Sequence, residues 1–364
     1  MKAGAIVARG EARVADADSL RRGRGGIIAL PLLGLLAAAG VLALGLGSVA
    51  IPPETIVRIL LAKVIGVGLP SAPTWTPGQE AIVTQIRLPR VLLAGLAGAA
   101  LAVAGATYQG LFRNPLGDPY LLGVAPGASL GATAVLVFGP ELGVFWLQLL
   151  PAAAFVGALG ATAVIYGLAR VERTTPVMTL LLAGVAVGSL LSAVTSFLMF
   201  ARPQHLHDAM FWLFGSFSQA GWAPLGMVLP YLAVGFALAA ILARPLNLLL
   251  LDEEQAQHLG IEVERTKLVL VVAATLLSAA TVAVSGLIGF VGLVAPHAAR
   301  LLWGPDYRTL LPASALLGAL FLVLADLFAR TVFAPGELPV GIVSALCGGP
   351  FFLYLLRKRK QGVY

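Results

Sequence analysis

The sequence predicts an all-α polytopic membrane protein with about ten transmembrane helices, and three observations lead to this fold class. Hydrophobic residues make up 59% of the chain and charged residues 11%, whereas about a quarter of the residues of a soluble protein are charged. The mean hydropathy is +0.93. Apolar runs also recur along nearly the whole length, each about 20 residues long, which is the length that a helix needs to cross the hydrocarbon core of a bilayer.

The expected transmembrane helices follow these runs in chain order. They lie at 27–49, 88–110, 119–138, 144–169, 177–200, 224–243, 267–285, 287–303, 309–332 and 340–356. The third and the eighth are short and interrupted by Gly and Pro, so a count of nine is the alternative. Small residues such as Gly98, Gly105 and Gly292 recur on helix faces, which indicates close packing of the backbones.

The distribution of Lys and Arg predicts the orientation. With the N-terminus inside, eighteen of the 24 Lys and Arg residues fall on the inner side, and cytoplasmic loops carry such an excess. Both termini are therefore expected in the cytoplasm. Residues 1–26 form a cytoplasmic N-terminal extension, 27–357 the transmembrane domain in contact with membrane lipid, and 358–364 a cytoplasmic tail.

Several classes of function are disfavoured. None of the Lys residues follows a Gly, so the phosphate loop of ATPases is absent and the chain is not expected to hydrolyse ATP by that mechanism. The net charge of +7 arises from basic residues at loop ends, which indicates membrane topology and not nucleic-acid binding. The single cysteine, Cys347, excludes an intrachain disulfide and a Cys-rich metal site. A membrane metalloenzyme is disfavoured because no His-Glu-x-x-His motif occurs, and His297 is interpreted as a packing or interfacial residue.

A proton-coupled secondary transporter is the main alternative from another class. Such a protein needs ionisable groups inside the bilayer. Asp326 is the one carboxylate clearly embedded in an expected span, and Arg330 follows at the i,i+4 spacing. This spacing favours a structural ion pair over a proton relay.

Three segments outside the spans are informative. Residues 51–86 form a long outer loop with an amphipathic stretch, and residues 201–223 place His205 and His207 beside aromatic residues in an interfacial segment. Residues 245–266 form the longest polar loop on the inner side. There, Asp252–Leu259 predicts a short amphipathic helix that Gly260 ends, and a second short helix is expected from Glu262 to Lys267. A helix–Gly–helix unit of this kind suits the docking of a soluble partner.

Four segments resemble one protein family in their order and spacing. They are Arg87–Ala132, Asp252–Val263, Ser285–Arg308 and Glu337–Leu356, which include Arg-Asn-Pro-Leu-Gly-Asp-Pro and His-Leu-Gly-Ile-Glu-Val. The segments are similar to the permease subunits of the cobalamin, iron-siderophore and haem ABC importers, the FecCD-like type II importers. The likeness extends over about residues 30–360.

This resemblance implies a fold, partners and a cargo. The fold is that of a type II importer permease with ten helices, in the bacterial inner membrane. The partners are a second copy in a homodimer, two cytoplasmic ABC ATPase subunits that bind ATP and Mg, and a periplasmic substrate-binding protein. No cofactor or metal site is expected in this chain. The expected cargo is an iron chelate, haem or a ferric siderophore, with cobalamin as the alternative. His205 and His207 would contact haem iron or face lipid headgroups.

The resemblance also assigns roles to residues. The residues that couple to the ATPase are Glu254, Ala256, Leu259 and Gly260. The outer-face residues that receive the binding protein are Arg87, Arg90 and Arg330, for which contact with lipid headgroups is the alternative. The residues of the cytoplasmic gate are Asn114, Leu116, Thr174 and Thr175, for which helix capping is the alternative.

The run at 177–200 is expected to line the transport pathway. Its small or weakly polar residues are Gly184, Gly188, Ser189, Ser192, Thr195 and Ser196. A wall of this kind suits a bulky, partly apolar cargo that must not bind tightly.

Overall fold

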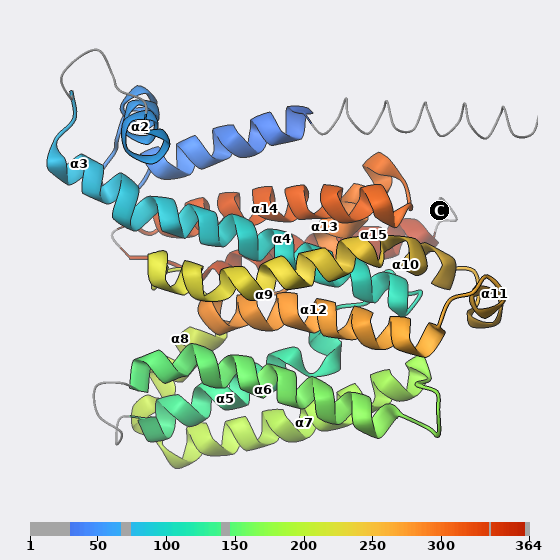
Figure 1. The fold of residues 1–364 in the computed structure, drawn as a ribbon. Coiled ribbons are helices and arrows are strands. Elements are labelled where there is room, and N and C mark those ends of the chain that lie inside the picture. The colour runs from blue at the N-terminus through green and yellow to red at the C-terminus, as the bar shows by residue number, and fades with distance from the viewer. Residues whose placement is uncertain (1–29, 67–73, 140–145, 335, 361–364) are drawn as a thin grey trace, which may run out of the picture.

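The computed structural model describes residues 30–66, 74–139, 146–334 and 336–360. These residues form a bundle of helices that run side by side (Figure 1). Within the described ranges, the only bridge between extended residues joins Val171 and Thr174. The all-helical expectation is therefore confirmed.

Six helices in the described ranges are long and apolar enough to cross a membrane. They are Pro77–Leu111, which contains α3 (Pro77–Ala81) and α4 (Leu88–Leu111), α6 (Trp146–Ala169), α7 (Val177–Ala201), α9 (Trp222–Ile241), α12 (Val263–Ser285) and α14 (Tyr307–Thr331). Shorter helices coincide with the other expected spans: Leu30–Gly45, α5 (Val124–Phe138), α13 (Val291–Trp303) and α15 (Val340–Lys360). Each expected run thus contains a helix, but the short lengths leave the count of ten spans unconfirmed.

The loops contain further short helices. Before α4 in the sequence come α2 (Pro53–Leu60) and a π-helical turn, Leu61–Ile65. Between α7 and α9 come the short turn Pro203–His205 and α8 (Leu206–Leu213). Between α9 and α12 lie α10 (Ala243–Leu249) and α11 (Glu253–His258). Figure 1 places α11 at the end of the bundle away from α2 and α3. These two ends are called the α11 end and the α2 end below.

Burial divides the helices into central and peripheral ones. Of the most apolar stretch of each helix, 72% is buried in α4 and in α12, whereas only 11% is buried in α7. Close backbone contacts hold the centre together. A Cβ atom added to Gly105 in α4 would lie 2.0 Å from the carbonyl oxygen of Gly292 in α13, and one on Gly98 would lie 2.1 Å from that of Gly318 in α14. The expected role of these glycines in close packing is confirmed.

One expectation about helix boundaries needs correction. The separate short helix expected from Glu262 to Lys267 does not form; Val263 instead begins α12, which continues without a break to Ser285. Helix α12 extends beyond its apolar run because its start contains charged residues, of which Lys267 pairs with Glu253 in α11. Helix α15 extends to Lys360, and the cytoplasmic tail expected at 358–364 stays a prediction. The N-terminal extension, 1–26, lies outside the described residues.

Candidate functional site

Helix α11 is a short helix that is fixed at both ends. Asp252 is its N-cap, and the carboxylate accepts a hydrogen bond from the backbone N–H of Glu253 at 2.7 Å, as N-cap side chains do. At the other end Gly260 has φ +84°. Gly260 donates its N–H to Gln257 O, and Ile261 donates to Ala256 O. This left-handed residue ends the helix at the position where the sequence predicted it.

The four expected coupling residues divide into one anchor and three surface residues. Ala256 is fully buried, while Glu254, Leu259 and Gly260 are exposed. The Leu259 side chain, at 59% exposure, is an apolar group on an otherwise polar helix. Apart from the glycine itself and its chain neighbours, no atom of the described residues lies within 4 Å of a Cβ placed on Gly260. The turn after α11 therefore presents an uncovered apolar surface at the end of the bundle.

Lys267 connects α11 to the neighbouring helices, a role that the sequence analysis missed. Its ammonium donates to Glu253 Oε2 in α11 at 2.7 Å and to Glu264 Oε1 in α12 at 3.0 Å. It also donates to the carbonyl oxygen of Thr175, just before α7, at 3.3 Å. The side chain is only 6% exposed. Glu264, three residues before Lys267 in the sequence, was the available signal.

The loops that carry the expected gate residues both contact the α11 segment. Arg113, beside Asn114 in the α4–α5 loop, pairs with Asp252 at 3.3 Å. Asn114 Oδ1 accepts from Leu116 N at 3.0 Å, so it does cap the turn. In the α6–α7 loop Thr175 is buried and is held by Lys267.

Asn114, Leu116 and Thr174 are exposed. The structure places the two pairs of expected gate residues in separate loops, and each loop is tied to α11 through a charged side chain. The α11 end of the bundle is therefore one connected unit.

The expected pathway residues occupy two faces of α7. Gly184, Gly188 and Thr195 face the subunit; a Cβ on Gly184 would lie 2.1 Å from Leu121 O, and Thr195 is buried. The exposed members of the set are Ser189, Ser192 and Ser196. The Ser196 hydroxyl bonds to the carbonyl of Ser192 at 2.9 Å, which lowers its demand for other partners. The outer face of α7 is thus apolar with a weakly polar stripe.

Two of the three expected docking arginines are buried at the α2 end. Arg87 is 5% exposed and donates to the carbonyl oxygens of Leu44, Gly45 and Val49 at 2.7, 3.1 and 2.5 Å. Arg330 donates to Ala43 O. Both satisfy carbonyls at the C-terminus of the helix Leu30–Gly45 that have no partner within the helix. They are not presented at the surface, where a docking residue has to be.

Arg90 is the centre of an ion cluster that joins α4, α14 and the segment before α15. Its guanidinium binds both oxygens of Asp326 at 2.9–3.1 Å and both oxygens of Glu337 at 3.0 Å. The expected pair of Asp326 with Arg330 is present at the longer distance of 3.6 Å. Glu337, with 37% of its side chain exposed, is the most accessible member.

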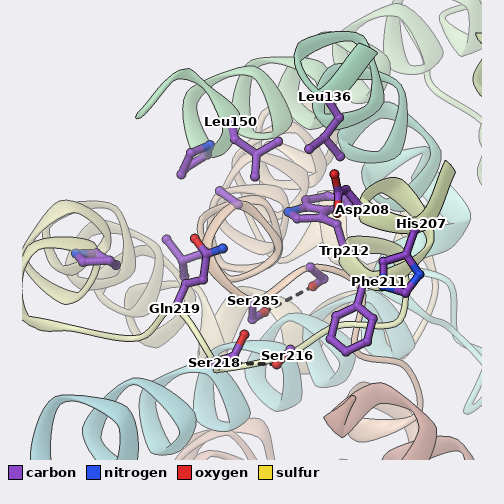
Figure 2. A pocket seen from close by; sticks show the side chains of 15 residues that line it. Leu136, Leu150, His207, Asp208, Phe211, Trp212, Ser216, Ser218, Gln219 and Ser285 are labelled. Carbon is purple, nitrogen blue, oxygen red and sulfur yellow. Dashed lines mark hydrogen bonds between the residues drawn. The ribbon is translucent and has the colours of Figure 1, made fainter. Parts of the chain in front are cut away.

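A cavity of about 440 Å³ lies near α8, between α5, α6 and α12. Figure 2 shows His207, Asp208, Trp212 and Gln219 around it. The His207 ring lies 5.8 Å from that of Phe211, whereas His205 is not among the lining residues. In the described ranges no three His, Cys, Asp or Glu side chains form a group that could hold a metal ion. His297 packs edge-on against Phe351, with the ring centres 6.0 Å apart.

The fold is a helical membrane bundle with a capped surface helix at one end and an exposed, weakly polar helix α7. The model of the FecCD transport family matches residues 35–358. The chain belongs to this family and is a membrane permease subunit of an ABC importer. Family membership implies a partner ATPase and a substrate-binding protein.

Named relatives and a solved structure support this assignment. The chain is 48% identical to the cobalamin import system permease protein of Halobacterium salinarum over 77% of this chain and 74% of that protein. It is 45% identical to the hemin transport system permease protein of Yersinia pestis over 76% of this chain and 83% of the relative. A metal-chelate type ABC transporter in an inward-facing conformation matches with a TM-score of 0.78 and 33% identity, covering 92% of this chain and 99% of the other.

Proposed function

We propose that this chain forms the translocation pathway of a bacterial inner-membrane importer for an iron chelate, either haem or a ferric siderophore. Support comes from the hemin permease of Yersinia pestis and from the solved metal-chelate type transporter. Cobalamin is the second candidate, because the cobalamin permease of Halobacterium salinarum is at least as similar. In the proposed assembly both termini are cytoplasmic, and the α11 end faces the ATPases.

The observation that carries the proposal is the connection of α11 to both inner loops. Leu259 and Gly260 seat in a groove of a cytoplasmic ATPase, which binds ATP and Mg. When the ATPases close, they displace α11. Lys267 passes this movement to the start of α7 through Thr175 O, and Asp252 passes it to the α4–α5 loop through Arg113. The gate residues on those loops then open or close the pathway.

The pathway itself lies between two copies of the chain. Helix α7 is the least buried of the six long helices, and a second copy would cover it in a homodimer with two-fold symmetry. Ser189, Ser192 and Ser196 then line the axis. Their hydroxyls offer weak polarity without a strong binding site, so a bulky cargo passes without being trapped.

At the α2 end, the substrate-binding protein docks through Arg90 and not through Arg87 or Arg330. Arg90 shares its guanidinium with the partly exposed Glu337, and an acidic residue of the binding protein would compete with Glu337 for it. The nearby cavity, with His207 on its wall, is the candidate contact for haem. A histidine nitrogen is a common iron ligand.

One experiment tests the cargo. The permease is purified with its ATPase and reconstituted in lipid, and its binding protein is loaded with haem, a ferric siderophore or cobalamin in turn. ATPase stimulation by the haem-loaded or siderophore-loaded form alone supports the iron-chelate proposal. Stimulation by the cobalamin-loaded form alone contradicts it and selects the second candidate.

A further inference from the structure

A second cavity, of about 410 Å³, opens between α9 and α14 and has α4 at its base. Phe236 and Ala240 of α9 form one side, Leu311 and Pro312 of α14 the other, and Val103 of α4 lies beneath. Small side chains and a proline leave room between the helices. The groove lies on the periphery of the bundle, where α9 is mostly unburied: 28% of its apolar window is covered. It therefore has the dimensions and surface of a site for an acyl chain.

The end of this groove carries two arginines. Arg244 of α10 and Arg308 in the first turn of α14 both line the cavity, and both are exposed. No carboxylate is among the lining residues. Within the part of the chain that the structure describes, neither guanidinium has an ion pair or a hydrogen bond. By contrast, the side chains of Arg90, Arg113 and Lys267 are all paired.

The nearest acidic residue in sequence does not neutralise this pair of arginines. Asp306 Oδ1 accepts from the side-chain amide of Asn247 in α10 at 2.7 Å and from the backbone N–H of Arg308 at 3.0 Å. Asn247 Oδ1 in turn accepts from Tyr307 N at 3.0 Å. The carboxylate is thus occupied by amide donors as the N-cap of α14, and the two guanidinium groups remain available to an anion.

We propose that this groove binds an anionic phospholipid, with its phosphate held between Arg244 and Arg308 and one acyl chain against α9 and α14. Basic pockets between transmembrane helices bind anionic headgroups, and the planar guanidinium matches phosphate geometry. An apolar groove ending in unpaired cations is complementary to such an amphiphile and not to free phosphate. With both termini in the cytoplasm, as given under Proposed function, this lipid would lie in the inner leaflet. The proposed binding of the lipid does not depend on that orientation.

The bound lipid would brace the segment that leads into α11. Arg244 belongs to α10, which precedes α11 directly, and Arg308 belongs to α14. The Asn247–Asp306 hydrogen bond already joins the same two elements. A phosphate bridging the arginines adds a second link there, so occupancy by an anionic lipid strengthens the mechanical connection between α11 and the bundle.

The test measures lipid retention on the full permease assembly by native mass spectrometry. The assembly is exchanged between dioleoylphosphatidylglycerol and dioleoylphosphatidylcholine. Each basic residue near an anionic lipid surface is worth roughly 1 kcal/mol, and about 1.4 kcal/mol is tenfold. The double variant Arg244→Gln/Arg308→Gln should therefore lose the preference for phosphatidylglycerol by about 30-fold, and each single variant by about fivefold.

Two further variants separate the sources of binding. Arg170→Gln/Arg173→Gln removes the same charge from exposed arginines outside the groove and should retain the lipid preference. Ala240→Phe fills the apolar side of the groove and should reduce retention with both arginines intact. Equal losses in the two double variants would overturn the proposal. The proposal would also be overturned if millimolar inorganic phosphate displaced the lipid and Ala240→Phe left lipid retention unchanged. That combination indicates a simple anion site. An unchanged lipid preference with weaker ATPase assembly in Arg244→Gln/Arg308→Gln would assign the arginines to a protein contact instead.

Discussion

The ammonium of Lys267 lies 2.7 Å from the carboxylate of Glu253 and joins the first turn of α11 to α12. The same ammonium bonds to Thr175 O and so reaches the start of α7. A lysine with 6% of its side chain exposed must be paired, because burial of an uncompensated charge is costly. One side chain therefore fixes the relative positions of α11, the central helix α12 and the peripheral helix α7, which is proposed to line the pathway.

Lys267→Met should uncouple the transporter. The substitution keeps an unbranched apolar side chain but removes the ammonium and all three of its hydrogen bonds, so α11 can move without moving α7. We expect transported cargo per ATP hydrolysed to fall severalfold in proteoliposomes, and the unfolding free energy to fall by about 1–3 kcal/mol. The control is Arg265→Gln, whose pair with Glu262 is 73–78% exposed and contributes little. Unchanged coupling in Lys267→Met would contradict the relay.

Gly105→Ala should destabilise the fold strongly for a single added methyl group. The new Cβ would lie 2.0 Å from Gly292 O, so α4 and α13 would have to separate, at a cost of roughly 1–3 kcal/mol or more. Gly160→Ala is the matched control. It lies inside α6, and among the described residues nothing beyond its chain neighbours and its own helix backbone is within 4 Å of the added atom, so it should be neutral or stabilising by up to about 1 kcal/mol. Thermal unfolding in detergent compares the two, and equal melting temperatures would refute the packing argument.

Asp326→Asn should destabilise the α2 end. Arg90 and Arg330 both depend on this carboxylate, which is 2% exposed, and loss of one partner of a buried ion pair costs about 3–5 kcal/mol. The double variant Arg90→Met/Asp326→Leu should recover part of the loss, because it removes both charges of the bidentate pair. Thermal unfolding tests both variants. A larger loss in the double variant than in Asp326→Asn would show that the cluster is not held as described.

Asp118, between α4 and α5, predicts a pH effect. Burial raises the pKa of its carboxyl group to about 6. A raised folded-state pKa gives stability that is complete below the ordinary value near 4 and is lost as pH rises through 6. Asp118→Asn keeps the hydrogen bond that the side chain accepts from Tyr120 N at 2.8 Å and cannot ionise. The variant should melt above the wild type at pH 7, with the difference shrinking toward pH 4. A difference that is constant across this range would contradict the assignment.

The sequence predicted the fold well because its main signal is local. Apolar runs of membrane length and the Asp252 to Gly260 pattern each depend on a few neighbouring residues, and each run contains a helix. The lengths were less predictable. Helix α13 has 13 residues, since Phe290 with φ +67° precedes it and Gly304 with φ +87° follows. The turn at Phe290 could not be predicted from the sequence, because Phe rarely adopts the left-handed backbone conformation.

The candidate site was predicted only in part. The predictions that failed concern contacts between residues that lie far apart in the sequence. Arginines at span ends looked accessible, yet Arg87 is buried by carbonyl groups more than 35 positions earlier in the chain. Arg90 meets Asp326, 236 positions away. The sequence pattern predicts Lys267 only as the end of a short helix, because its partner Thr175 O is a backbone atom that carries no signature in the sequence. Contacts of this kind depend on which helices are neighbours.

The most direct test of the account is the coupling ratio of Gly260→Val. Valine at φ +84° strains the turn and adds bulk where no atom lies within 4 Å, so it blocks the surface proposed to seat in the ATPase. Gly304→Val also places valine at a positive φ, +87°, with open space around the added atoms, but outside α11. With the ATPase and the loaded binding protein present, we predict a severalfold loss of cargo transported per ATP in Gly260→Val and near-normal transport in Gly304→Val. Normal uptake by Gly260→Val would contradict the role of α11.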